Sequence, residues 1–362
     1  MLAFVVGAAL LTVCCSAGSE RSGGSVPSMI AEDPTSTTAG ARPPSTLAPD
    51  AFDAADAALR QRVSAAGLAG GVLRVVRGGV LVHDLSVGSV TATTPLSVAS
   101  STKWLTAATL MTFVDEGAVR LDDSIDRWLP EFAADAPSIT VRQLLIHTSG
   151  VRDQDCLWSG GPLAECVRRL ARSPRQFPAG SAYSYGNADF HVIGRLVEEL
   201  AGTDFATAVR ERITGPLGME ATVWPGAPTA AGPAAGVRTT VEDYMRFLAM
   251  IAGRGRFGDR QVLSGAAIAE IITDHLGGYD TSGDFAVGIT RIPRYGLGCW
   301  PDVVDDTGAT VVVSGNGGKG FYPWADLSTD SYGIVGVQDD RGAQVAVPAS
   351  QRVAVAARAA LA

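Results

Sequence analysis

The order of apolar and polar residues predicts a chain whose two ends build a sheet. Apolar residues recur at helical spacing over Ala51–Ala66, and two apolar runs around a Gly78-Gly79 turn predict a hairpin over Gly70–Val87. Three strands and a last Ala/Val-rich helix are expected near the C-terminus, over Thr310–Ser314, Phe321–Ala325, Tyr332–Val337 and Gln351–Leu361. The simplest topology is one antiparallel sheet flanked by the N- and C-terminal helices.

The middle of the chain has mainly helical periodicity. Residues 101–116 are apolar on more than one face, so this helix must be buried. Further helices are expected over Val141–Ile146, Phe190–Leu200, Val241–Ile251 and Gly265–Ile272. The fold class is therefore α/β, of the α+β kind: one domain over residues 49–362, with a mainly helical second lobe at about 115–235. A cleft between the lobes is the natural place for a site.

The N-terminal residues have the composition of a targeting segment. Residues 1–17 hold an apolar run too short to span a bilayer, followed by Cys14 and Cys15, which indicates a signal or a lipoprotein signal. The alternative is a buried strand or helix. Residues 18–48, rich in Ser, Pro and Gly, predict a flexible tether. We expect an exported protein, in the cell envelope or secreted, attached to a membrane only if a lipid is added at its N-terminus.

Charge and composition narrow the function. The net charge is -8 and the pI about 5.1, which argues against a nucleic-acid partner. Of 29 basic residues only Lys103 and Lys319 are lysines. Because arginine keeps its proton in proteins and a buried lysine can lose it, each lysine is a candidate for proton transfer. The histidines and cysteines lack zinc-ligand spacing, so neither a metal nor another cofactor is expected.

The segment Ser100-Ser101-Thr102-Lys103 is the first chemical motif. Residues three apart share a helical face, so a buried Lys103 can reach Ser100 and take its proton. A helix N-terminus also supplies N–H groups for an oxyanion. The alternative is a capping Ser100 and a Lys103 that extends to solvent.

The run around this motif resembles the class C serine β-lactamases and their esterase, D-aminopeptidase and penicillin-binding relatives. It continues through Glu116-Gly117, Leu121-Asp122-Asp123, Trp128–Phe132 and Ile139–Leu145 to His147-Thr148-Ser149-Gly150. The resemblance covers about residues 52–360 and implies a β-lactamase/transpeptidase-like fold with Ser100 as nucleophile and Lys103 as its partner. It also implies that His147 belongs to a structural turn.

Two further segments resemble family motifs. Tyr185-Gly186-Asn187 is similar to the Tyr-x-Asn element, with Tyr185 as a catalytic acid and base whose pKa a nearby lysine lowers, and Asn187 as a contact to substrate or Lys103. The alternatives are a turn tyrosine and a helix cap. The third motif departs from the family's Lys-Thr-Gly or His-x-Gly.

At the third motif the chain reads Ser314-Gly315-Asn316-Gly317-Gly318-Lys319-Gly320, with no cation at the expected place. Asn316, Gly317, Gly318 and Lys319 are the candidate substrate-binding residues of this segment. A backbone N–H of Gly318 or Lys319 can complete an oxyanion site. Lys319 either restores the missing charge from a shifted position or is an exposed lysine at a strand end.

These residues predict a serine hydrolase that forms an acyl-enzyme with a small ester, amide, peptide or β-lactam, esterase-like or carboxypeptidase-like rather than a potent β-lactamase. The alternative is a catalytically weak penicillin- or cell-wall-peptide-binding protein of the same fold. No obligate protein partner is inferred. Cys156 and Cys166 can pair across a short loop in an oxidising compartment, which leaves Cys299 unpaired.

Overall fold

The computed structural model describes residues 47–135, 137–154, 161–226 and 231–362, all within one compact unit of residues 44–362. The predicted signal and most of the predicted tether lie outside the described residues. Among the described helices, none has both the length and the apolar character needed to cross a bilayer.

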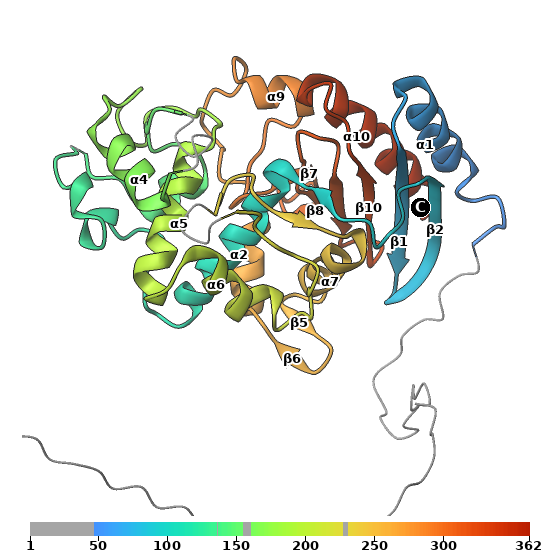
Figure 1. Cartoon of the computed structure of the whole chain (residues 1–362), viewed down its shortest axis with the longest axis horizontal. Coiled ribbons are helices and arrows are strands. Elements are labelled where there is room, and N and C mark those ends of the chain that lie inside the picture. The colour runs from blue at the N-terminus through green and yellow to red at the C-terminus, as the bar shows by residue number, and fades with distance from the viewer. Residues whose placement is uncertain (1–46, 136, 155–160, 227–230) are drawn as a thin grey trace, which may run out of the picture. The chain divides into compact units, whose positions relative to one another are not determined.

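A six-stranded antiparallel sheet joins the two ends of the chain (Figure 1). Its strand order is β2-β1-β10-β9-β8-β7. The strands are β1 Gly70–Arg77, β2 Val80–Gly88, β7 Trp300–Val304, β8 Thr310–Ser314, β9 Tyr322–Asp326 and β10 Ser331–Val337. In the central pairing, Leu73 of β1 lies opposite Val335 of β10. The predicted antiparallel sheet is confirmed.

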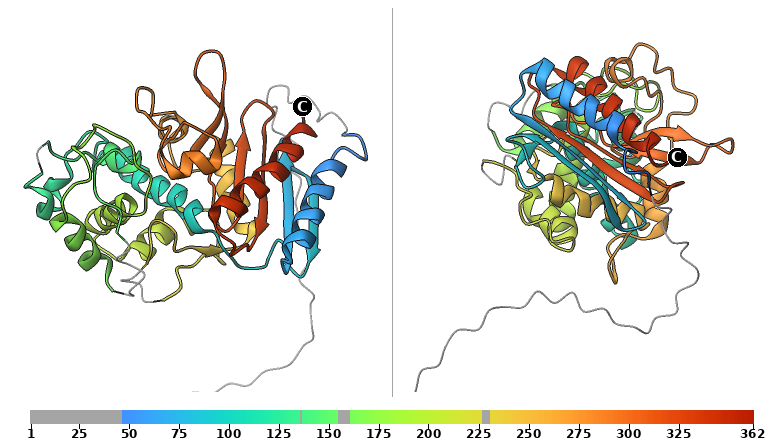
Figure 2. Two further views of the ribbon diagram at one scale, coloured as in Figure 1. Left: turned by 90° about the horizontal axis from the view of Figure 1, so that it is seen from above. Right: turned by 90° about the vertical axis from the view of Figure 1, so that its right-hand side faces the viewer.

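One face of the sheet is covered by the terminal helices, α1 (Asp53–Ala66) and α10 (Ala343–Ala359), which lie side by side (Figure 2). Strand residues alternate between faces, so Leu73, Val75 and Val335 join the buried cluster beneath these helices. Trp324 is fully buried in the same cluster. The layer is held mainly by apolar burial.

The other face of the sheet packs against α7 (Val241–Ala252), which contacts β9 and β10. The helix α2 (Thr102–Asp115) lies beyond, and nearly all its residues are buried, as the sequence predicts. It contacts α5 (Ala188–Ala201) and α8 (Gly265–Ile272). α2 therefore joins the sheet side of the molecule to the helical side.

The helical side collects most elements between residues 115 and 225 (Figure 1). These are α3 Val141–Leu145, α4 Leu163–Arg172, α5, α6 Phe205–Val209 and the short turns at Ile125–Arg127, Pro130–Phe132 and Arg210–Thr214. Two-stranded pairs, β3 Leu96–Ser97 with β4 Arg238–Thr239 and β5 Arg256–Phe257 with β6 Arg260–Gln261, and the helix α9 Phe285–Thr290 complete the fold.

Several boundaries differ from the sequence prediction. α10 begins at Ala343 rather than Gln351 and contains Pro348, a residue that lacks the N–H for a helical hydrogen bond. β7, α4 and α9 were not predicted. Each is short, and only α4 shows a clear amphipathic pattern in isolation.

Gly298 brings the segment before β7 against the first turn of α2. Its φ is +76°, and a Cβ placed there would lie 2.6 Å from the Lys103 carbonyl oxygen and 3.1 Å from the Ala107 Cβ. Only glycine allows this approach without displacing α2. The contact fixes the depth at which the N-terminal turn of α2 lies.

We expect Gly298→Ala to lower the free energy of unfolding by about 2–4 kcal/mol, because strain in φ adds to a collision with backbone. Gly308→Ala is the matched control: its φ is +84° but nothing lies within 4 Å of the added carbon. Gly308→Ala should lower the free energy of unfolding by about 1 kcal/mol, the cost of the positive φ alone. Urea unfolding of both variants measures the difference, and equal losses would contradict the packing argument.

Candidate active site

The turn that carries Ser100 is fixed from both sides of the molecule. Ser100 lies in a short 3-10 turn, Ala99–Ser101, directly before α2. The Ser101 hydroxyl donates to the carbonyl oxygen of Gly315, and the Tyr244 hydroxyl donates to the Ser101 carbonyl at 2.8 Å. Ala99 has φ 45°, a strained value for a residue with a side chain. Strain of this kind persists only where the surroundings impose it, and it is frequent at functional sites.

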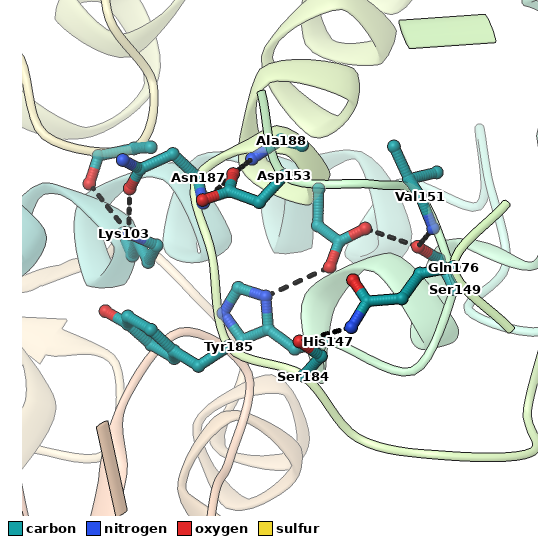
Figure 3. A network of polar contacts seen from close by, with 12 residues as sticks. Lys103, His147, Ser149, Val151, Asp153, Gln176, Ser184, Tyr185, Asn187 and Ala188 are labelled. Atoms are coloured by element: carbon teal, nitrogen blue, oxygen red, sulfur yellow. Dashed lines mark hydrogen bonds and ion pairs between the residues drawn. The ribbon is translucent and has the colours of Figure 1, made fainter. Parts of the chain in front are cut away.

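Lys103 is fully buried, and its amino group has three neighbours. The Nζ donates to Asn187 Oδ1 at 2.9 Å (Figure 3). It also donates to the Ala234 carbonyl at 3.2 Å and lies 3.4 Å from Ser100 Oγ. An uncharged amine has two N–H donors and one lone pair. The two shorter contacts use the donors, which leaves the lone pair for the Ser100 proton.

Burial lowers the pKa of Lys103 to about 7, against the opposing influence of the Asp153 and Asp189 carboxylates. At neutral pH a large fraction of the side chain is therefore uncharged. This is the protonation state that a base for Ser100 needs.

Tyr185 and Asn187 lie on the same segment, at the N-terminus of α5. The Tyr185 ring centroid is 4.8 Å from the Lys103 Nζ, and Tyr185 and Ser100 line the same cavity. The backbone is held by two carboxylates: Asp284 Oδ2 accepts the Tyr185 N–H at 2.9 Å, and Asp153 Oδ1 accepts the Asn187 N–H at 2.8 Å. The structure thus brings together the first two predicted motifs.

The protonation of Tyr185 differs from the sequence expectation. Burial raises the pKa of the phenol well above its usual range, and the Asp284 and Asp153 carboxylates add to this, while the Ser100 hydrogen bond opposes it. The sequence predicts instead that the nearby lysine lowers this pKa. A lysine of which a large fraction is uncharged exerts little attraction on a phenolate, so the phenol stays protonated.

His147 supports the site from behind. It is buried, its ring centroid lies 4.6 Å from that of Tyr185, and its Nδ1 lies 3.0 Å from Asp189 Oδ2. The other Asp189 oxygen accepts from the Ser149 hydroxyl. Burial, with a contribution from Lys103, lowers the pKa of His147 to about 3, so the ring is neutral. This agrees with the packing role that the sequence suggested.

The third motif lies beside the nucleophile. Gly317 packs so closely that a Cβ would lie 2.3 Å from the Val98 carbonyl oxygen, and the Gly318 N–H donates to no other described residue. Asn316 is 5% exposed and Ser314 is buried. The Ser314 hydroxyl donates to Asp302 Oδ1 at 2.6 Å, and it contacts the Asn316 amide at 3.2 Å.

Lys319 is directed away from this group. Its Nζ forms an ion pair with Asp340 at 2.8 Å, and 41% of its side chain is exposed. It is not among the described residues that line the cavity beside Ser100. The structure places the lysine at the surface, as in the second of the two alternatives that the sequence left open, and its charge is compensated there.

A cavity of about 260 Å³ opens beside Ser100. Tyr185, Asn187, Asn316 and Gly318 line it, and Asp153 and Trp300 contribute from other segments. Its remaining wall is mainly apolar and comes mostly from α9 and α10, with Phe285, Ala286, Ile289, Thr290, Ala343 and Val347, together with Gly186. The cavity has the dimensions of a site for a small ligand.

Comparison with known proteins identifies the class. The family model described as Beta-lactamase matches residues 55–358, so the chain belongs to the β-lactamase family, and it is a serine hydrolase. Penicillin-binding protein 4 of Amycolatopsis lactamdurans is 29% identical over 321 residues, with 74% of this chain and 84% of the relative covered.

An esterase and D-aminopeptidases match shorter parts of the chain. Esterase EstB of Burkholderia gladioli is 34% identical over 193 residues, covering 45% of this chain and 48% of the relative. A D-aminopeptidase of Cereibacter sphaeroides is 32% identical over 167 residues, covering 41% and 32%. Among solved structures, a candidate β-lactamase of Bacteroides dorei superposes with a TM-score of 0.75 at 28% identity, covering 86% of this chain and 98% of that one.

Two other sequence expectations concern cysteines and metals. Cys156 lies outside the described residues, so the Cys156–Cys166 bridge stays a prediction, whereas Cys299 is a buried free thiol. Within the described residues, no three His, Cys, Asp or Glu side chains are grouped to hold a metal ion.

Sequence reasoning missed Asp153, Asp284 and the wall formed by α9. Asp153 follows the His147–Gly150 run by three residues, and that proximity to a motif was the one available signal. Asp284 acts through backbone N–H groups: it caps α9 and holds the Tyr185 amide, 99 residues away in sequence. A carboxylate that accepts a backbone N–H does not require a particular residue type at the donor position, so the sequence shows no sign of the contact.

The pKa of Lys103 predicts a dependence of stability on pH. Between about pH 7 and 10 the folded protein holds Lys103 uncharged while the unfolded chain protonates it, so unfolding takes up a proton and stability rises with pH. Relative to Lys103→Met, the wild-type free energy of unfolding should rise by about 2 kcal/mol from pH 7 to pH 9. Urea titrations at several pH values measure this, and parallel curves for the two proteins would show a lysine with its ordinary pKa.

Proposed function

We propose that the protein hydrolyses a small ester or amide through an acyl-enzyme on Ser100. The observation that carries the proposal is the environment of Lys103, a buried amine with two acceptors for its N–H groups and with Ser100 Oγ 3.4 Å away as its third neighbour. This arrangement activates a serine hydroxyl, which is otherwise a poor nucleophile.

The proton moves in a closed cycle. Lys103 takes the Ser100 proton as Oγ bonds to the substrate carbonyl carbon, and the backbone N–H groups of Ser100 and Gly318 receive the oxyanion. Tyr185 then gives its phenolic proton to the leaving oxygen or nitrogen and recovers one from the Lys103 ammonium. A water molecule attacks the acyl-enzyme with the roles reversed, which releases the acid and restores Ser100.

We propose that esters and amides without a carboxylate beside the scissile bond are better substrates than β-lactam antibiotics. The third motif supplies no cation, and Lys319 is paired with Asp340. An anionic group bound there would lose its hydration without gaining an ion pair. Relatives named esterase and D-aminopeptidase are in keeping with this.

A second candidate is a weakly catalytic protein that binds penicillin or cell-wall peptide. The same third motif favours it, and penicillin-binding protein 4 is among the relatives. The two candidates differ in the fate of the acylated serine. Label that persists on Ser100 from a fluorescent penicillin, without product, supports the binding protein; label that is released with product supports the hydrolase.

We propose, in addition, that the protein is exported, on the grounds of the apolar segment and tether in residues 1–48. Whether Cys14 or Cys15 carries a lipid is testable by mass analysis of the membrane fraction.

Ser100→Ala should abolish both labelling by a fluorophosphonate and turnover of p-nitrophenyl acetate and butyrate, a loss of at least about 10³-fold. Peptide mapping of the wild-type adduct identifies the nucleophile. Ser97→Ala, a partly buried serine outside the cavity, is the control and should retain both activities. An adduct at another residue would contradict the assignment.

The pH profile should show one acid limb. Because Lys103 must be uncharged to accept the proton and its pKa is about 7, kcat/KM should fall about tenfold per unit well below pH 7 and level off above pH 8. Asp153, Asp189, His147 and Tyr185 are the titratable groups around it. Lys103→Arg should be inactive across this range, and a rate that keeps rising to pH 10 would argue for a solvated lysine.

A further inference from the structure

The cavity beside Ser100 carries one charged side chain among the described residues that line it, and that side chain is an acid. The other lining residues are apolar or uncharged, and the acid is Asp153. Both lysines of the chain are accounted for elsewhere, one beneath the nucleophile and one on Asp340. The electrostatic character of the cavity is therefore set by a carboxylate.

Asp153 is held in a defined position relative to the nucleophile. Its Oδ1 accepts the N–H groups of Asn187 at 2.8 Å and Ala188 at 2.9 Å, the first amides of α5 (Figure 3). Asn187 is itself the partner of Lys103. Two hydrogen bonds to backbone fix the carboxylate more firmly than a side-chain partner would.

The second carboxylate oxygen is available. No described residue donates to Asp153 Oδ2 or forms an ion pair with this side chain, although the exposed Arg152 is its neighbour in sequence. An unpaired carboxylate oxygen at the wall of a cavity is an acceptor for a cation or an N–H donor.

The third motif also presents no positive group. Asn316 Oδ1 lies 3.2 Å from the Ser314 hydroxyl, and the buried Asn316 Nδ2 has no hydrogen-bond partner among the described residues. An amide carries no charge in either orientation. The third motif therefore leaves the Asp153 carboxylate as the charged group of the cavity wall among the described residues.

We propose that Asp153 is a specificity-determining residue that binds a protonated amine of the substrate, so that the preferred substrates are aminoacyl esters or amides with a free ammonium group near the scissile carbonyl. This deepens the proposed function and rests on it. The carboxylate contributes a charge-assisted hydrogen bond to the ammonium, while the apolar residues of α9 and α10 face the substrate's side chain.

Lys103 is compatible with such a ligand. A bound ammonium repels the charged form of Lys103 and so lowers its pKa. Substrate binding therefore favours the uncharged lysine that the proposed reaction requires. A substrate carboxylate would have the opposite effect on Lys103 and would also meet Asp153 as a like charge.

The test compares two substrates of nearly equal shape, alanine p-nitroanilide (D or L) and isobutyryl p-nitroanilide, in which a methyl group replaces the ammonium, at about pH 7, where the α-amino group is largely protonated. The wild type should prefer the ammonium substrate in kcat/KM by about five- to tenfold. In Asp153→Asn the preference should fall to about one, because the asparagine oxygen can still accept from the α5 amides but carries no charge. Glu131→Gln, an exposed carboxylate outside the cavity, removes the same charge and should keep the wild-type preference.

The outcomes separate the two proposals. Ser100-dependent turnover with the same preference in Asp153→Asn and wild type overturns the role of Asp153 and leaves the hydrolase intact. If no substrate is turned over and Ser100 takes no adduct, the proposed function fails. The amine site is then decided by calorimetry on Ser100→Ala: alaninamide binding tighter than isobutyramide, and only with Asp153 present, supports it, and equal binding overturns it.

Discussion

The burial of one amino group, that of Lys103, is the constraint on which the site depends. Taking a lysine out of water is unfavourable for its charged form, so the protein holds the side chain uncharged and satisfies its N–H groups with Asn187 and Ala234. The same burial lowers the pKa of Lys103, and an uncharged amine beside Ser100 can accept the hydroxyl proton. Replacing the amine with an apolar group would remove the desolvation cost and, under the proposed mechanism, the base for Ser100, a common relation between stability and activity at such sites.

Contacts on both sides of Lys103 fix the positions of the segments that surround its amino group. The turn with Ser100 is tied to the third motif through Ser101 and Gly315, and its depth is fixed by the contact of Gly298 with α2. On the helical side, Asp153 and Asp284 hold the backbone of the Tyr185–Asn187 segment, and the buried His147 packs behind the phenol. The reacting groups thus come from separate segments, and each is positioned by backbone contacts rather than by its immediate neighbours.

The sequence was informative where a residue's role is visible in its own segment. β8 has the predicted bounds, and the buried α2 follows from its continuous apolar run, with Ser100 and Lys103 at helical spacing. The start of α10 was missed because Pro348 indicates a break that packing overrides. Asp153 and Asp284 were missed because they act on amides far along the chain. The predicted direction of the Tyr185 pKa shift was wrong, because the burial that raises this pKa is not visible in the sequence.

The strand order has a consequence for how the chain reaches this structure. β1 lies between β2 and β10, so the N-terminal hairpin gains its inner neighbour only when β10, Ser331–Val337, has been made. Until then the apolar side of β1 and the inner face of α1 lack the partners that bury them. Such distant pairing is slow, because a long loop must close before the contacts form. A chain truncated before β10 would leave β1 and β9 as open sheet edges that can pair with other chains.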